Sequence, residues 1–288
     1  MKNTDIQAFF DPTTFTVSYI ISDKVSKECA IIDPVLDFDP VSGRTETKSA
    51  AKLIEYIQLN QLQTVWILET HAHADHLSSA SYLKIQLGGK TAIGEQITKV
   101  QSAFKTPFNM EPEFKADGSQ FDQLLADGDI IKIGQTAIRV IHTPGHTPAC
   151  LSYEVDGVMF VGDTLFMPDF GTARTDFPGG DAKILYHSIQ KILAYPGETK
   201  IFVGHDYKAP DRDFYAWEST VALQKSNNIH INENIAEQQF IECRTTRDST
   251  LTMPALILPA VQVNIRAGEM PPKEDNGVSY LKLPINFF

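Results

Sequence analysis

The sequence predicts an α/β fold with mixed β-sheets. Short runs of β-branched and apolar residues alternate with longer segments that carry apolar residues at helical spacing, which is the pattern of βα units. Two glycine-containing turns, at 134–135 and 156–157, each lie between apolar runs and predict antiparallel hairpins. Strands joined by helices and strands joined by tight turns thus occur in one chain. This combination predicts sheets that are partly parallel and partly antiparallel.

The first half of the chain predicts two strands, a helix, a third strand and a second helix. The strands are short runs rich in valine, isoleucine and threonine, and Pro34 ends the second of them. Both helices carry apolar residues close to helical spacing, and Gly88 with Gly89 ends the second helix. The expected ranges are 15–21, 28–32, 49–62, 64–68 and 78–87.

The second half predicts two hairpins, then a helix and a strand. Their ranges are 130–133 with 136–141, 151–155 with 158–161, 182–194 and 200–203. After Tyr207 the periodic pattern weakens, and from Thr250 on the chain is rich in proline and apolar residues without a clear period. We therefore expect a catalytic core over residues 1–206 and an extension over 207–288, which packs on the core within one structural domain.

The composition is typical of a globular enzyme. The 288 residues are 42% hydrophobic, which is enough to bury a sizeable core. The net charge of −11 argues against nucleic acid or an anionic membrane surface as a partner, because both require basic patches. No apolar run approaches membrane-spanning length, and residues 1–5 show no signal pattern, so we expect a cytoplasmic protein. The cysteines, Cys29, Cys150 and Cys243, are far apart and odd in number, which favours reduced thiols.

Residues 70–76, Thr-His-Ala-His-Ala-Asp-His, are the most informative segment. His71, His73 and Asp75 alternate, so they cannot share one face of a helix, where neighbours lie three and four residues apart. The loop follows the strand expected at 64–68, and open α/β sheets place their ligands at the carboxyl ends of strands. Crowding these polar side chains together gains no packing energy unless a cation holds them. The segment therefore predicts a metal site.

Later strands also end in residues that bind metals. The segment 142–146, His-Thr-Pro-Gly-His, contains a proline and a glycine that require a turn, so its histidines do not lie on a helix face. We favour His146 as a ligand because it lies past the turn, and we interpret His142 as a strand-end residue. Asp163 follows the next hairpin and would supply the negative charge that neutral histidines lack. His205 follows the last predicted strand.

In their order and context these segments resemble the metallo-β-lactamase fold, and the match covers residues 15–206. The resemblance implies a four-layer αββα sandwich with two adjacent metal sites. One site would use His71, His73 and His146, and the other Asp75, His76 and His205. Asp163 would be able to bridge the two ions, and Asp33 would hydrogen-bond to the loop rather than bind metal.

Finer features resemble the persulfide dioxygenases, a group close to glyoxalase II. These features are the segments 69–80 and 171–177, Gly94, Gln101, and the segments 261–264, 276–277 and 280–282. The resemblance implies one Fe(II) per chain, held by His71, His146 and Asp163, a triad that leaves open positions for substrate and O2. The remaining candidates would be surrounding groups or a vacant second metal site: His73, Asp75, His76, His205 and Asp33. The implied activity is oxidation of a glutathione-type persulfide with O2 and water to sulfite and the free thiol.

Substrate recognition requires a positive charge, because glutathione carries carboxylates. Arg174 is the first choice by resemblance, and the alternative is a loop arginine paired with Asp176 or Asp169. Tyr207 and Lys208 are further predicted substrate contacts, with simple exposure as the alternative.

Two other functions stay open at this point. Every residue for a second metal is present, which is compatible with a dinuclear hydrolase of the glyoxalase II or lactamase type. The chain lacks an evident helical C-terminal domain like that of glyoxalase II, which weakens a thioester-hydrolase assignment. The other alternative is a non-catalytic metal- or thiol-binding module. A homodimer and a separate sulfurtransferase also stay open as partners.

Overall fold

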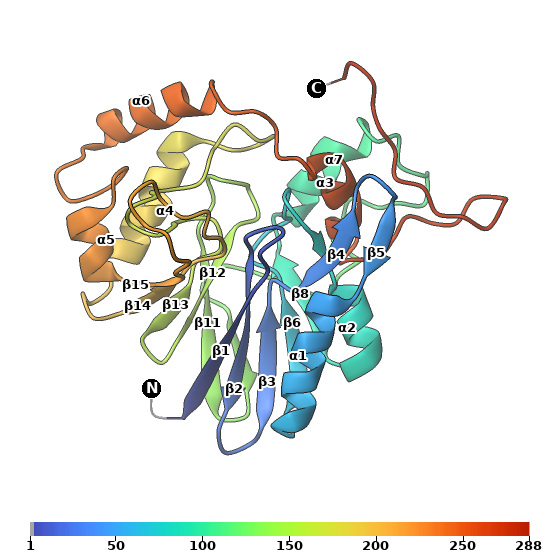
Figure 1. Ribbon diagram of the computed structural model, residues 1–288, viewed down its shortest axis with the longest axis horizontal. Coiled ribbons are helices and arrows are strands. Elements are labelled where there is room, and N and C mark those ends of the chain that lie inside the picture. The colour runs from blue at the N-terminus through green and yellow to red at the C-terminus, as the bar shows by residue number, and fades with distance from the viewer. Residues whose placement is uncertain (1–2, 288) are drawn as a thin grey trace.

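A computed structural model describes residues 3–287, in which two β-sheets pack face to face between outer helices (Figure 1). Residues 1 and 2 of the N-terminal segment considered above lie outside the described residues. The first sheet has the order β1-β2-β3-β6-β8-β9. It is antiparallel from β1 to β3 and parallel from β3 to β9. The bounds are β1 Thr4–Phe10, β2 Val17–Asp23, β3 Glu28–Ile32, β6 Gln63–Leu68, β8 Lys90–Gly94 and β9 Gln123–Leu125.

The second sheet has the order β10-β11-β12-β13-β14-β15. The β13–β14 pair is parallel and the others are antiparallel. The bounds are β10 Ile130–Ile133, β11 Thr136–His142, β12 Leu151–Val155, β13 Val158–Phe160, β14 Lys200–Phe202 and β15 Glu218–Thr220. A small third sheet, in the order β5-β4-β7, joins β4 Val35–Asp39, β5 Arg44–Glu46 and β7 Leu77–Ser78.

Apolar side chains from the two large sheets form the central core. Tyr19 and Ile32 of the first sheet belong to the same buried cluster as Val140 and Phe160 of the second. Alternation along the strands explains this, because every second side chain of a strand points to the same face. On the other face of the first sheet, Ile31 belongs to a separate cluster with residues of α1 and α2.

Helices cover both outer faces, and Figure 1 shows the resulting four layers. The bounds are α1 Lys48–Leu59, α2 Ala80–Leu87, α3 Ile97–Lys105, α4 Ala182–Leu193, α5 Val221–Asn227, α6 Glu237–Asp248 and α7 Ile257–Asn264. The first two pack on the first sheet, whereas α4 packs on the second sheet through Leu185 and Ile189. Asp181 precedes α4, and its side chain accepts a hydrogen bond from the Ile184 amide at 2.8 Å, which caps the helix. The predicted αββα sandwich with mixed sheets is confirmed.

The chain after Tyr207 contains more regular structure than its sequence predicts. β15 extends the second sheet, and Val221 and Phe240 join the cluster beneath α4. The segment after Thr250 contains α7, although Pro259 lies within it. This proline occupies the first turn, where its missing amide hydrogen costs no intrahelical bond. Residues 207–287 thus add a strand to one sheet and side chains to the buried clusters.

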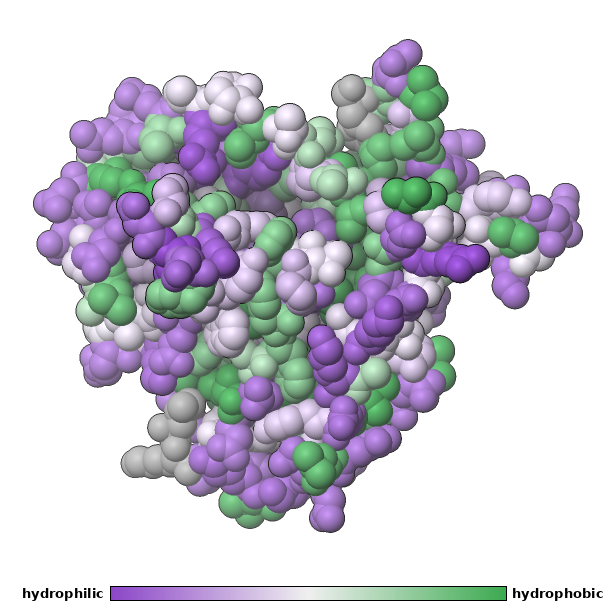
Figure 2. All heavy atoms as spheres, viewed as in Figure 1, coloured by the Kyte–Doolittle hydropathy of each residue, from purple (hydrophilic) through white to green (hydrophobic). Residues whose placement is uncertain are grey.

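The surface seen in Figure 2 is largely polar around its periphery, and apolar residues gather along the middle. In the part of the chain that the structure describes, none of the helices has both the length and the apolar character needed to cross a membrane.

Candidate metal centre

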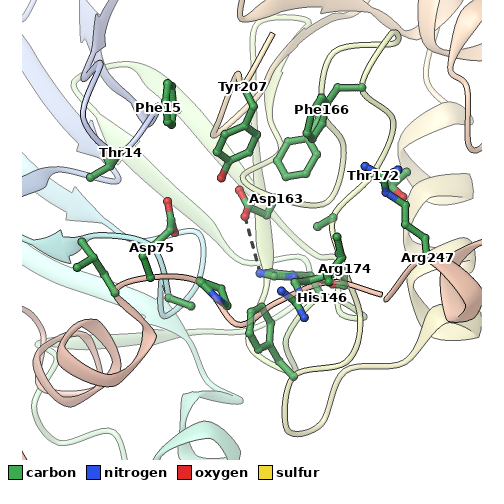
Figure 3. Close-up of a pocket in the computed structure, with 18 of the residues that line it drawn as sticks. Thr14, Phe15, Asp75, His146, Asp163, Phe166, Thr172, Arg174, Tyr207 and Arg247 are labelled. Carbon is green, nitrogen blue, oxygen red and sulfur yellow. Dashed lines mark hydrogen bonds and ion pairs between the residues drawn. The ribbon is translucent and has the colours of Figure 1, made fainter. Parts of the chain in front are cut away.

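The predicted ligands come together where several strands end. The loop 69–76 follows β6, and His146 lies in the loop that follows β11. Asp163 and His205 lie shortly beyond β13 and β14, two neighbouring parallel strands of the second sheet. Because both sheets end at this edge, ligands separated by up to half the chain meet in one buried site. Figure 3 shows His146 and Asp163 facing each other, with Asp75 to the left of Asp163.

His71, His146 and Asp163 form a first group of candidate ligands, whose ligand atoms lie within 4.8 Å of one another. The Nε2 atoms of His71 and His146 lie 3.9 and 3.8 Å from Asp163 Oδ2. These separations are too long for hydrogen bonds but fit three ligands arranged around one ion, since metal–ligand bonds are near 2 Å. All three side chains are buried.

Hydrogen bonds orient both histidines with Nε2 toward the centre. His146 Nδ1 lies 2.7 Å from the Arg174 carbonyl oxygen, which can only accept, so Nδ1 carries the hydrogen. Thr70 Oγ1 donates to Asp33 at 2.8 Å and therefore accepts from His71 Nδ1 at 3.0 Å. In both rings Nε2 keeps its lone pair for a metal. Burial, the largest effect, lowers the pKa of His71 and His146 and so favours these neutral forms.

A second group of candidate ligands comprises His73, Asp75, His76 and His205, again with ligand atoms within 4.8 Å of one another. His205 Nε2 lies 3.2 Å from Asp75 Oδ2 and 3.3 Å from Asp163 Oδ1. The two oxygens of Asp163 therefore face the two groups, which is the arrangement that a bridging carboxylate needs. His76 Nδ1 lies 3.0 Å from the Leu77 carbonyl oxygen, so its Nε2 is free to bind a metal.

His73 differs from the other histidines because two carboxylates lie against it. Its Nε2 is 3.0 Å from Asp33 Oδ1 and 3.3 Å from Glu69 Oε2. Although burial opposes a charged ring, these carboxylates raise the pKa of His73 well above its ordinary value. Burial also raises the pKa of Glu69, to about 7. His73 thus contacts two carboxylates and also belongs to the second group of candidate ligands.

Buried polar atoms without hydrogen-bond partners show that the site fits a cation. They include His71 Nε2, His76 Nε2, His205 Nε2, Asp75 Oδ2 and Asp163 Oδ1. Such atoms each carry a free-energy penalty unless a partner compensates them. Imidazole nitrogens and carboxylate oxygens are also the ligands that first-row transition metals prefer. The chain is therefore a metal-binding protein.

Asn264 of α7 braces the metal loop and was not recognised as a site residue from the sequence. Its side-chain amide donates to the carbonyl oxygens of His73 and His76, both at 2.8 Å, and its Oδ1 accepts from the Ser78 amide at 2.8 Å. The segment 261–264 carried a family resemblance but no local signal of this contact. Ser78 Oγ in turn donates to Glu69, which ties the carboxylate beside His73 to the same brace.

Gly162 permits the close packing that holds His71. Its φ is +50°, a left-handed conformation that L side chains rarely adopt. A Cβ atom at this position would lie 2.5 Å from Thr70 Oγ1, the hydroxyl that orients His71. The glycine before Asp163 thus lets the backbone pass beside Thr70 without a clash.

A cavity of about 560 Å³ opens beside the metal ligands. Asp75, His146 and Asp163 line it, together with several aromatic residues. Tyr207, a predicted substrate contact, lines the cavity, and its ring stacks on His205 with an interplanar angle of 12°. The cavity is also lined by Phe15, Phe38, Phe166, Phe170, Phe177, Arg174, Arg244 and Arg247.

The other predicted substrate residues have partners within the protein. Arg174 lines the cavity, but its guanidinium makes two 2.6 Å contacts with Asp176 and a third with the Thr252 carbonyl oxygen. Arg174 was interpreted either as a substrate contact or as a loop arginine paired with an aspartate. In the structure its guanidinium forms the ion pair with Asp176. Lys208 is not among the described residues that line the cavity, and its Nζ lies 4.5 Å from the centroid of the Tyr215 ring. His142 is the last residue of β11, as expected for a strand-end residue, and its Nε2 lies 2.9 Å from the Pro148 carbonyl oxygen.

Comparison with known proteins agrees with this geometry. The model of the metallo-beta-lactamase superfamily matches residues 12–205. A probable metallo-hydrolase of Burkholderia pseudomallei is 53% identical, over 98% of this chain and 99% of its own. Glyoxylase B2 of Dictyostelium discoideum is 52% identical, over 98% of this chain and 97% of its own. The human mitochondrial persulfide dioxygenase ETHE1 is 30% identical, over 93% of this chain and 90% of its own. The crystal structure of ETHE1 from Myxococcus xanthus superposes with a TM-score of 0.73 at 26% identity, over 92% of this chain and 100% of that chain.

Proposed function

The chain belongs to the metallo-beta-lactamase superfamily, and from this premise we propose that it is a mononuclear non-haem iron enzyme that oxidises a glutathione-type persulfide. In this proposal His71, His146 and Asp163 hold one Fe(II). The likeness to persulfide dioxygenases over nearly the whole chain supports it.

The observation that supports the proposal is the composition of the first group. That group consists of two histidines and one carboxylate, the ligand set of iron oxygenases that keep positions open for O2 and substrate. A hydrolytic site would add His73, whose Nε2 contacts Asp33 and Glu69.

The overall reaction is R–S–SH + O2 + H2O → R–SH + SO3²⁻ + 2H⁺. The terminal sulfur is oxidised, O2 is reduced, and the S–S bond breaks to release the thiol. When bound, Fe(II) supplies the one-electron chemistry that lets O2 react with the sulfur. The protein's own groups bind the substrate and orient its sulfur.

Tyr207 supplies a hydrogen-bond donor beside the reacting groups. Figure 3 shows its hydroxyl directed toward the region of Asp163. The ordinary pKa of a phenol is about 10. The hydroxyl therefore stays protonated at neutral pH and donates to an anionic ligand atom. Phe166 and Phe170 pack near Tyr207 and give the cavity an apolar wall that limits water.

A dinuclear hydrolase is the second candidate, and specific observations favour it. The second group retains Asp75, His76 and His205, which could hold another ion with Asp163 between the two. The relatives at 53% and 52% identity also carry the names of a metallo-hydrolase and a glyoxylase, whereas the persulfide dioxygenase is more distant at 30%. A bound metal pair would activate water instead of O2.

Replacing His76 or His205 by alanine tests the choice between these functions. If one iron sits in the first group, both variants should keep their metal content near that of the wild type. Oxygen uptake with glutathione persulfide should fall by roughly 10- to 100-fold, because these residues only support the ligands. The measurements are elemental analysis and an oxygen electrode. Loss of half the bound metal in either variant would favour the dinuclear hydrolase.

A further inference from the structure

We propose that Arg247, on α6, binds a carboxylate of the ligand at the end of the cavity away from the metal. This inference rests on the proposed function and assigns a residue that sets specificity for a substrate whose carboxylate is remote from the sulfur.

The cationic residues that line the cavity differ in whether they are already paired. Arg174 is held by Asp176 and the Thr252 carbonyl oxygen. Arg244 is buried, with Nε and Nη2 at 3.0 and 2.7 Å from Asp248 Oδ1, and it also donates to the Thr172 carbonyl oxygen at 2.9 Å. Both guanidinium groups therefore hold the protein together rather than face a ligand.

Arg247 is the exception. Its guanidinium makes no ion pair or hydrogen bond with any residue between 3 and 287, and its side chain is exposed. Asp248, the adjacent carboxylate, is occupied by Arg244 and by the amide and hydroxyl of Thr175. An unpaired guanidinium that lines a cavity offers a planar set of donors that matches a carboxylate.

The charges of the cavity orient such a ligand. Asp75 and Asp163 lie on one side, and Figure 3 shows Arg247 on the other side, near Thr172. In a chain of net charge −11, an anionic ligand group is repelled from the acidic side unless metal neutralises it, and is attracted to Arg247. The cavity lining includes Phe166 and Phe170, against which an uncharged backbone can pack.

The cavity volume also fits this class of ligand. About 560 Å³ lies within the range of roughly 300–1,000 Å³ that is typical for small-molecule sites. A tripeptide thiol such as glutathione is of suitable size and carries carboxylates at both ends, so one carboxylate can reach Arg247 while the sulfur approaches the metal.

Calorimetric titration of the protein, purified with its metal, tests this inference. The probes are glutathione and glutathione with both carboxylates esterified. The wild type should bind glutathione roughly tenfold more tightly than the diester, because one charge-assisted contact is lost. Arg247→Gln should abolish this preference, and Arg247→Lys should retain only part of it. Arg139→Gln removes the same charge from an exposed position on β11, outside the residues lining the cavity, and should keep the full preference.

Two outcomes would overturn the inference: a wild type without the preference, or an Arg247→Gln variant that keeps it. Failure of the proposed function can be told apart from failure of this inference. If only the proposed function fails, no persulfide causes oxygen uptake, but the preference for glutathione over the diester still depends on Arg247. In that case Arg247 would recognise the anionic substrate of a different reaction.

Discussion

Replacing Asp163 by alanine is expected to strip the metal and to lower oxygen uptake by more than the roughly 100-fold that changes around metal ligands cost. Asp163 is the only carboxylate of the first group, and its two oxygens face the histidines of both groups at 3.3 to 3.9 Å. Its loss removes a ligand and the negative charge that compensates the ion. Elemental analysis and an oxygen electrode measure the two effects.

An exposed aspartate provides the control for this variant. Asp117 lies in a surface loop, where its carboxylate accepts a hydrogen bond from the Ser119 amide. Asp117→Ala should therefore leave iron content and oxygen uptake at wild-type levels. An Asp163→Ala protein that kept both its iron and its full rate would contradict the assignment of the triad.

Replacing Asn264 by alanine is expected to destabilise the fold by about 3 kcal/mol or more and to weaken metal binding by roughly 10- to 100-fold. The substitution leaves three buried backbone groups without their partner: the carbonyl oxygens of His73 and His76, and the Ser78 amide. Each unsatisfied group costs about 1–3 kcal/mol. Denaturant unfolding gives the free energy of unfolding, and metal titration gives the affinity.

Asn60 is the matched control, because it is exposed and its side chain makes one hydrogen bond, to the Tyr56 carbonyl oxygen at 2.8 Å. Asn60→Ala should change the free energy of unfolding by less than about 1 kcal/mol and should not change metal affinity. Equal effects of the two substitutions would show that Asn264 does not brace the metal loop.

The candidate metal ligands could be found from the sequence because each follows a strand. The alternation of His71, His73 and Asp75 indicates an extended loop, and the later ligands come after apolar runs that end in turns. The ends of neighbouring strands meet at one edge of a sheet. A residue that directly follows a strand in the sequence therefore lies at that edge, where the site is. The resemblance to a known fold then supplied the layer order, which periodicity alone did not.

Contacts between distant segments could not be predicted in this way. Asn264 braces a loop 186 to 191 residues earlier in the chain, and nothing in its neighbourhood indicates that partner. The choice between Arg174 and Arg247 likewise depends on which guanidinium finds a carboxylate after folding. The helix that carries Arg247 was missed because it buries few apolar residues, and Phe240 is the only buried hydrophobic side chain in its span of the described structure.

We propose that one iron per chain oxidises a persulfide. The most direct test of this proposal is elemental analysis of anaerobically purified protein combined with oxygen uptake and sulfite formation from glutathione persulfide. We predict one iron per chain, and one sulfite formed for each O2 consumed. Two zinc ions per chain, with hydrolysis of a glutathione thioester and no oxygen uptake, would contradict the proposal.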